Sequence, residues 1–194
     1  MLRILVAILI LFLFSCKTKN RKENLYKPDS YAQITTNPFT KEISYKTRFN
    51  YFNDTVEVIF WDTKDSIPSI QKENYEGFIS KQDILSPDVM KKIFEFYNDS
   101  YLDYKKGWTA MGNIGKEELE KFLPRPTTPH ALKKYITPVY VHIQNREECK
   151  LGTLGIEFDC PWDQENGLGV KIRNWKVVEA GVAETSYFFK GDSL

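Results

Sequence analysis

Residues 153–180, TLGIEFDCPWDQENGLGVKIRNWKVVEA, contain three short apolar runs separated by turn-forming residues. Apolar side chains recur within these runs with the period of two that is typical of β-strands. Asn166-Gly167 and Arg173-Asn174 lie where the chain has to reverse its direction. With one apolar stretch before them, the runs predict an antiparallel meander. Its strands are residues 138–145, 153–160, 168–173 and 175–180.

Two hairpins of this meander are predicted to bring apolar side chains together on one face. The expected pairs are Val141 with Phe158, Ile143 with Ile156, Val170 with Val177, and Ile172 with Trp175. The first of these registers also sets His142 opposite Glu157 on the polar face of the sheet.

Another hairpin is predicted nearer the N-terminus. Apolar and polar side chains alternate over residues 45–51 and 55–60, and Asn53-Asp54 forms a turn between them. A two-residue turn at this point fixes the register. The resulting pairs are Phe49 with Val58 and Tyr51 with Val56.

Helices are predicted between these two groups of strands. Apolar spacing indicates a short helix over 69–81, a longer one that begins at Ser86 and stops at Gly107, and a short one at 116–122. Ser86 is the expected N-cap, and Pro87 suits the first helical position. The side chains expected to face the core are Ile70, Tyr75, Phe78, Ile79, Val89, Met90, Ile93, Phe94, Tyr97, Tyr101 and Tyr104.

The order of these elements is typical of an α+β fold: an N-terminal β-hairpin, two to three helices, and a C-terminal antiparallel meander. Residues 41–194 are long enough to bury one sizeable core, and we interpret them as a single domain. The Pro-rich segment 124–129, PRPTTP, is interpreted as a loop within it.

The composition excludes several classes of protein. Apolar residues make up 42% of the chain and aromatic residues 14%, which excludes an intrinsically disordered chain. The 27 basic and 26 acidic side chains give a net charge of +1. A nucleic-acid-binding domain is expected to have a pI above about 9, whereas this chain has a pI of about 7.6. We therefore expect no nucleic-acid partner.

Residues 1–15 have the layout of a secretory signal peptide, with Arg3 followed by apolar residues from Ile4 to Phe14. As a helix, this apolar stretch is about 16 Å long. A bilayer-spanning helix needs about 20 residues. The stretch is therefore too short to cross a membrane.

Residues 13–16, Leu-Phe-Ser-Cys, resemble the lipobox of bacterial lipoproteins. The resemblance implies that the signal is removed before Cys16 and that acyl chains are attached to Cys16. Several acyl chains, at about 0.8 kcal/mol per buried CH₂ group, anchor a protein stably to a bilayer. Two alternatives stay open: an ordinary cleaved signal with a coincidental cysteine, and a short anchor that is not cleaved.

Residues 16–40 are interpreted as the lipidated cysteine and a flexible polar tether. A flexible chain of this length has a root-mean-square reach of about 27 Å. Lys17 follows the cysteine, and by resemblance to envelope lipoproteins it favours the outer membrane, with the domain facing the periplasm.

Cys149 and Cys160 are not expected to form a disulfide. A strand of about seven residues between them spans more than about 20 Å, and a disulfide requires Cα atoms within about 7 Å. Cys160 shares a strand face with Ile156 and Phe158, which indicates a small core residue and not a nucleophile.

The sequence contains no HExxH, CxxC, GxSxG or P-loop pattern. His130 and His142 are its only histidines. His142 with Glu157 and Asp159 is a candidate metal set, and a solvated cross-strand ion pair is the favoured alternative. We assign no catalytic residue, metal or cofactor.

Residues 159–170 hold the densest polar cluster of the chain. The candidate site residues in it are Asp159, Trp162, Asp163, Glu165 and Asn166. A calcium loop requires glycine at its sixth position, where this chain has Leu168. In a structural interpretation Trp162 fills the rim of the core, Asn166-Gly167 allows left-handed backbone, and Gly169 allows a close approach. A structural turn is favoured, and a ligand or partner site stays open.

Residues 155–159, GIEFD, and 162–170, WDQENGLGV, resemble the closing signature of a group of uncharacterised bacterial domains. That signature reads G-I-x-F-x-x-x-W-D-x-E-H-G-x-G-V, and Asn166 stands in this chain where the signature has histidine. By analogy, the resemblance implies an immunity-like or partner-binding role in bacterial competition.

Two functional hypotheses follow. The first is a non-catalytic, membrane-anchored binding protein of the envelope, immunity-like, whose partner is an envelope protein or a toxin. The second is a metal-dependent or hydrolytic enzyme that uses the acidic turn 159–165 and His142. The absence of a catalytic motif and the predicted anchor favour the first.

The lipobox predicts the mass of the mature protein. We expect mass spectrometry of the membrane fraction to find a chain that begins at Cys16 and carries acyl chains on that residue. An unmodified Cys16 thiol, or an intact leader, would contradict the prediction.

Overall fold

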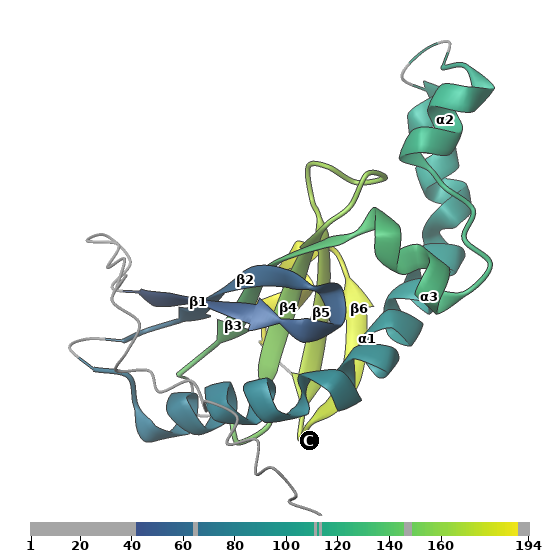
Figure 1. Ribbon diagram of the computed structural model, residues 1–194. Helices are drawn as coiled ribbons and strands as arrows, with labels where there is room; N and C mark the ends of the chain where they lie inside the picture. Colours follow the sequence, from purple (N-terminus) through teal and green to yellow (C-terminus); the bar gives the residue numbers. More distant parts are fainter. Residues whose placement is uncertain (1–41, 64–65, 111, 113, 146–148, 190–194) are drawn as a thin grey trace, which may run out of the picture. The chain divides into compact units, whose positions relative to one another are not determined.

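The computed structural model describes residues 42–63, 66–110, 112, 114–145 and 149–189. They form a single α+β domain in which a six-stranded, mostly antiparallel sheet packs against helices (Figure 1). The predicted fold class is confirmed, with its N-terminal hairpin and its C-terminal strands.

The proposed signal peptide, Cys16 and the tether of residues 16–40 lie outside the described residues. In the described part of the chain, no helix combines the length and the apolar character that crossing a bilayer requires.

The spatial order of the strands follows the sequence, from β1 at one edge to β6 at the other. All neighbouring strands are antiparallel except β2 and β3, which are parallel. A parallel pair needs a long crossover connection, which the helices between β2 and β3 supply. The sequence analysis did not predict this pairing. The strands are β1 (Ile43–Phe49), β2 (Asp54–Phe60), β3 (Thr137–Ile143), β4 (Leu154–Asp159), β5 (Leu168–Arg173) and β6 (Lys176–Gly181).

The helix α1 (Ser69–Ala110) is continuous where the sequence predicted two helices. Ser86 is not an N-cap: it is buried inside the helix, and its hydroxyl donates to the carbonyl of Gln82. Pro87 lacks an N–H group and so removes one helical hydrogen bond, which is a usual cause of a kink. Figure 1 shows that α1 changes direction between the part beside the sheet and its C-terminal part. Gly107 does not stop the helix.

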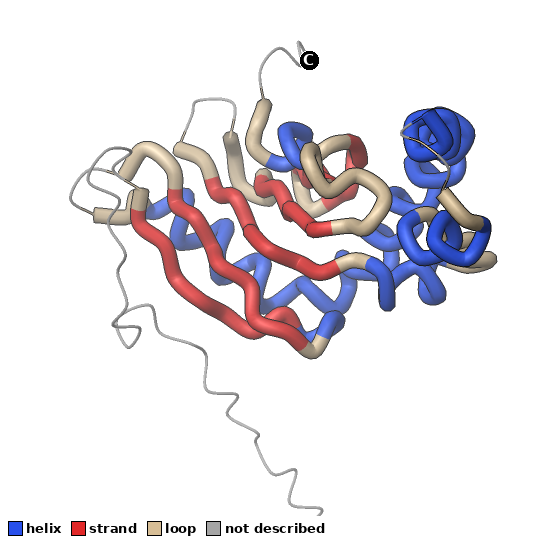
Figure 2. Tube along the Cα trace, turned by 90° about the horizontal axis from the view of Figure 1, so that it is seen from above, coloured by secondary structure: helices blue, strands red, loops and turns tan. Residues whose placement is uncertain are grey.

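The core lies between α1 and one face of the sheet (Figure 2). Residues of α1 both before and after Pro87 are buried in the core, which explains why the helix continues through Pro87. Most of the helical side chains predicted to face the core are buried. They are Tyr75, Phe78, Val89, Met90, Ile93, Tyr97 and Tyr101, while Ile70, Ile79, Phe94 and Tyr104 are only partly buried.

Two short helices complete the crossover. The helix α2 (Lys116–Phe122) matches its predicted range. The helix α3 (Pro129–Leu132) begins after Thr128, whose side chain accepts a hydrogen bond from the backbone N–H of Ala131. A 3₁₀ turn, η3 (Lys133–Tyr135), then leads into β3.

The predicted register of the first hairpin is wrong by four residues. The 3₁₀ turn η2 (Asn50–Phe52) ends β1 earlier than predicted, so Phe49 and Tyr51 do not face Val58 and Val56. Because the shift is an even number of residues, each side chain keeps its predicted face. The observed pairs include Phe49 with Asp54 and Thr47 with Val56.

The predicted register of β3 and β4 is wrong by two residues over Tyr140–His142, and by three residues beyond the β-bulge between Pro138 and Tyr140. Val141 and Ile143 therefore do not face Phe158 and Ile156 as predicted. The observed pairs include Tyr140 with Glu157, Val141 with Ile156, and His142 with Gly155.

The turn between β5 and β6 lies one residue later than predicted. Asn174 and Trp175 both have positive φ, 49° and 60°, as a type I′ turn requires. Trp175 is placed there because its ring lies against Gly77 of α1, where an added Cβ would be 2.0 Å from the ring. Val170 and Ile172 therefore do not face Val177 and Trp175. The observed pairs are Ile172 with Val177 and, beyond a bulge, Val170 with Ala180.

The face of the sheet opposite α1 is crossed by residues 182–187, which we call the C-terminal strap. The strap contains the 3₁₀ turn η4 (Ala183–Ser186). An added Cβ on Gly155 would lie 1.6 Å from the carbonyl oxygen of Ser186, and one on Gly169 would lie 2.6 Å from that of Val182. The predicted close approach at Gly169 is confirmed, and these two glycines of the closing signature make room for the strap.

We expect Gly155→Ala to lower the free energy of unfolding by about 3 kcal/mol, the upper end for overpacking, because the methyl group overlaps the strap backbone. The matched control is Gly107→Ala on α1, where an added Cβ meets nothing within 4 Å. That control should stabilise the domain by about 0.4–1 kcal/mol. Urea unfolding measures both, and a Gly155→Ala variant as stable as the wild type would refute the account of the strap.

Candidate functional site

The loop between β4 and β5 contains most of the residues predicted to form a site. Asp159, Glu165 and Asn166 are exposed, and Asp163 is half-buried. Trp162 differs from them, because only 2% of its surface is exposed. The loop therefore offers polar side chains to solvent around one buried aromatic residue.

Trp162 is part of the core, as the structural interpretation predicted. Its ring contacts that of Tyr97 with a centroid separation of 4.4 Å, and its carbonyl accepts a hydrogen bond of 2.9 Å from Nε1 of Trp108. Trp162 therefore fixes the loop against α1.

Asp163 organises the backbone of the loop. Its Oδ1 accepts hydrogen bonds from the backbone N–H and the side-chain Nδ2 of Asn166, at 3.1 and 2.9 Å. Its carbonyl accepts the N–H of Gly167 at 2.9 Å, and Gly167 has the predicted left-handed conformation, with φ of 61°. The carbonyl of Asn166 accepts the N–H of Ala183, which ties the loop to the strap.

On one side of this loop lies a hollow of about 350 Å³, which we call the acidic pocket. Among the residues that the structure describes, no lysine or arginine lines it. Burial and the charges of Glu157 and Glu184 raise the pKa of Tyr187 in its wall. Its acidic side chains come from β4, the loop and the strap, and they are Glu157, Asp159, Glu165 and Glu184.

On the other side of the loop lies a hollow of about 370 Å³, which we call the aromatic pocket. The last turns of α1 form one wall and the loop forms the other. Burial and the nearby carboxylate of Asp163 raise the pKa of Tyr104. The aromatic and acidic residues that line the pocket are Tyr104, Trp108, Trp162, Asp103, Asp163 and Glu165.

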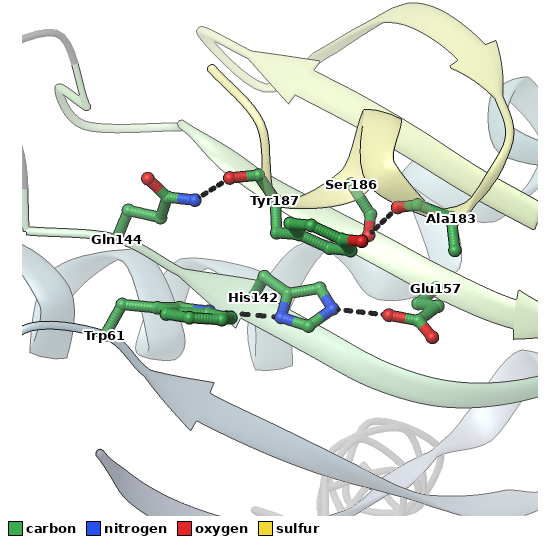
Figure 3. A network of polar contacts seen from close by, with 7 residues as sticks. All are labelled: Trp61, His142, Gln144, Glu157, Ala183, Ser186 and Tyr187. Carbon is green, nitrogen blue, oxygen red and sulfur yellow. Dashed lines mark hydrogen bonds and ion pairs between the residues drawn. The ribbon is translucent and has the colours of Figure 1, made fainter. Parts of the chain in front are cut away.

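His142 and Glu157 are in contact, as predicted, although they are diagonal neighbours and not directly opposite each other. The pair is not solvated as predicted, because His142 is buried. Nε2 of His142 lies 2.8 Å from Oε2 of Glu157, and Nδ1 accepts a hydrogen bond of 3.1 Å from Nε1 of Trp61 (Figure 3). Because Nδ1 accepts, Nε2 carries the proton that is donated to Glu157. The ring of Tyr187 packs edge-on against that of His142, with centroids 5.3 Å apart.

This arrangement leaves His142 without a nitrogen for acid–base chemistry. The hydroxyl of Ser186, the nearby serine in Figure 3, donates to the carbonyl of Ala183 at 2.7 Å. His130 lies elsewhere, in a pocket with Lys133 and Lys134. In the described part of the chain, no three His, Cys, Asp or Glu side chains are placed to hold one metal ion.

Of the aromatic residues in and around the site, Trp162 was predicted from the sequence, and those that were missed are Trp61, Tyr104, Trp108 and Tyr187. Trp61 and Tyr187 are far from the loop in sequence. The spacing of Tyr104 and Trp108 does indicate a shared surface. They are four positions apart on a helix, which places them on one face, and they follow its last buried residue. Gly107 was interpreted as a stop, which hid that signal.

A family profile described as a domain of unknown function (DUF6985) matches residues 32–188. No curated protein and no solved structure matches the chain. The family match covers most of the chain and includes both pockets.

Cys160 is a buried free thiol, so the predicted absence of a Cys149–Cys160 disulfide and the predicted core position are confirmed. Its Sγ donates to the carbonyl of Asp163 at 3.7 Å. Burial raises the pKa of Cys160 from 9.0 to about 12, which disfavours the reactive thiolate.

This pKa predicts a loss of stability at high pH. Because the unfolded thiol ionises near pH 9 and the folded thiol near pH 12, the stabilisation is complete below pH 9 and is lost as the pH rises toward 12. We expect the free energy of unfolding to fall over this window, and to fall less in Cys160→Ala. Native Cys160 should also resist iodoacetamide at pH 8.5 until urea unfolds the domain. Rapid alkylation of the native thiol would contradict the prediction.

Proposed function

Because this chain belongs to the family of the domain of unknown function DUF6985, we propose a function from the arrangement of its own residues. The protein is a lipoprotein of the bacterial envelope, anchored through acylated Cys16, whose domain binds a protein partner without catalysis. The partner presents a basic segment to the acidic pocket.

The acidic pocket is the observation that carries this proposal. Asp159, Glu165 and Glu184 are exposed and, among the described residues, form no ion pair with a lysine or arginine. Several carboxylates around one hollow favour a positively charged partner and speed its association. They do not converge on a single metal ion. A chain segment with several basic side chains fits this spread of charge better than one small cation.

The second hypothesis, a metal-dependent or hydrolytic envelope enzyme, has less support. Of its candidate residues, Asp163 holds the turn through Asn166, and His142 is occupied by Trp61 and Glu157. Neither side chain is left to activate a nucleophile or a water molecule.

The proposed anchor sets the place where this binding occurs. Acyl chains on Cys16 hold the protein at a membrane surface, and Lys17 favours the outer membrane, with the domain in the periplasm. The tether of residues 16–40 gives the domain a reach of about 27 Å. A partner that enters the envelope, such as a toxin, meets the domain there, which is the setting of an immunity-like protein.

Capture of the partner by the full-length lipidated protein tests the function. We expect one envelope or toxin protein to be enriched from a detergent extract, and enrichment to fall about tenfold in the double variant Glu165→Gln/Glu184→Gln, which corresponds to about 1.4 kcal/mol. Raising the salt concentration should weaken the capture, because exposed charges are screened.

The matched control is Glu73→Gln/Glu76→Gln, which removes the same charge from exposed positions of α1 outside both pockets. This control should capture the partner as the wild type does. No reproducible enrichment, or equal losses in the two double variants, would count against the proposed function.

A further inference from the structure

We propose that the aromatic pocket binds the guanidinium group of an arginine side chain of the partner protein. This inference rests on the proposed function, because the arginine is supplied by that partner. The bound arginine makes a second contact with the protein, on the side of the β4–β5 loop that lies opposite the acidic pocket.

The pocket presents aromatic rings that are held in place. Trp108 stacks on Phe122 with a centroid distance of 4.6 Å and an interplanar angle of 11°, and its Nε1 donates to the carbonyl of Trp162 at 2.9 Å. Tyr104 is partly buried on the last turns of α1 and lines the same pocket. Fixed aromatic rings favour a cation that stacks on them, because little side-chain freedom is lost on binding.

The pocket also has more negative than positive charge. Asp103 pairs with Lys106 at 3.3 Å, and both side chains are strongly exposed, so this acid adds little. The carboxylate of Asp163 already accepts the hydrogen bonds of the turn. Glu165 has no cationic partner among the described residues. Glu165 is therefore the acid that is free to pair with a ligand.

Arginine fits this combination better than other organic cations do. Its planar guanidinium stacks on aromatic rings and offers paired N–H donors to a carboxylate. A quaternary ammonium group has no N–H donor for Glu165, and a lysine ammonium group lacks the planar face. The volume of about 370 Å³ is near the lower end for ligand pockets, which suits one side chain.

Gly107 keeps the pocket open on the α1 side. It lines the pocket, and an added Cβ there meets nothing within 4 Å. The Cβ of a larger side chain at this position therefore begins in unoccupied space, on the wall of the pocket.

The two pockets share one boundary. Gln164, Glu165 and Asn166 line both of them. A basic segment that crosses this loop can place one cationic side chain in the aromatic pocket and others in the acidic pocket.

The test uses small probes on the full-length protein in detergent and does not require the partner to be known. Arginine methyl ester is the probe, and citrulline methyl ester is the control probe, because it keeps the α-amino group and has an uncharged ureido group in place of the guanidinium. We expect arginine methyl ester to shift the indole N–H resonances of Trp108 and Trp162 saturably in the millimolar range. Citrulline methyl ester should bind at least tenfold more weakly.

Three variants locate the binding. Gly107→Leu should weaken the binding of arginine methyl ester at least tenfold while its thermal unfolding stays cooperative, and Glu165→Gln should weaken it about fivefold. Asp99→Asn removes a charge from an exposed position of α1 outside the pocket, and should bind as the wild type does.

Equal shifts with both probes, no saturable shift at Trp108, or binding that Gly107→Leu leaves intact would each overturn the proposal. These outcomes are independent of the capture experiment, so a failure of the arginine pocket is distinguishable from a failure of the proposed function. Once the partner is identified, a Gly107→Leu variant that captures it as well as the wild type does would also overturn the proposal of an arginine pocket.

Discussion

The contact of the C-terminal strap with two glycines of the sheet is the constraint on which the rest of the structure depends. At Gly155 and Gly169 the strap backbone lies so close to the sheet that a methyl group does not fit. The contact covers the face that α1 leaves open. It also brings Tyr187 over His142 and Glu184 to the acidic pocket, so both the buried network of Figure 3 and one wall of the candidate site follow from it.

Alternation of side chains was sufficient to predict which residues face the core, but not which residues pair. The first hairpin shifted by four residues and β3–β4 by two over Tyr140–His142, so the side chains there kept their predicted faces, whereas the bulge reverses the faces before it. The registers depend on distant packing, such as the ring of Trp175 against Gly77. The same holds for α1, where burial on both sides of Pro87 outweighed the local signals for a helix start.

Most of the polar half of the candidate site was predictable because it comes from one loop, whereas Glu184 reaches the acidic pocket from the strap and was not predicted. Asp163 and Glu165 are close in sequence, so the predicted turn alone indicated that they lie near each other. The aromatic half was not predictable in this way, because Tyr104 and Trp108 reach the loop from the end of α1, more than fifty residues earlier in the chain. A local motif therefore identified where charge is concentrated and missed the rings beside it.

The single parallel pairing in the sheet has a consequence for the order of folding. Strands β3 to β6 join neighbours in sequence, whereas β2 meets β3 only after a crossover of more than seventy residues has formed, with Glu57 beside Tyr140. Contacts across long stretches of chain form slowly, because loop closure has to precede the gain from pairing. We therefore expect the meander of β3 to β6 to form early in folding. The N-terminal hairpin, which completes the sheet, should dock on it late.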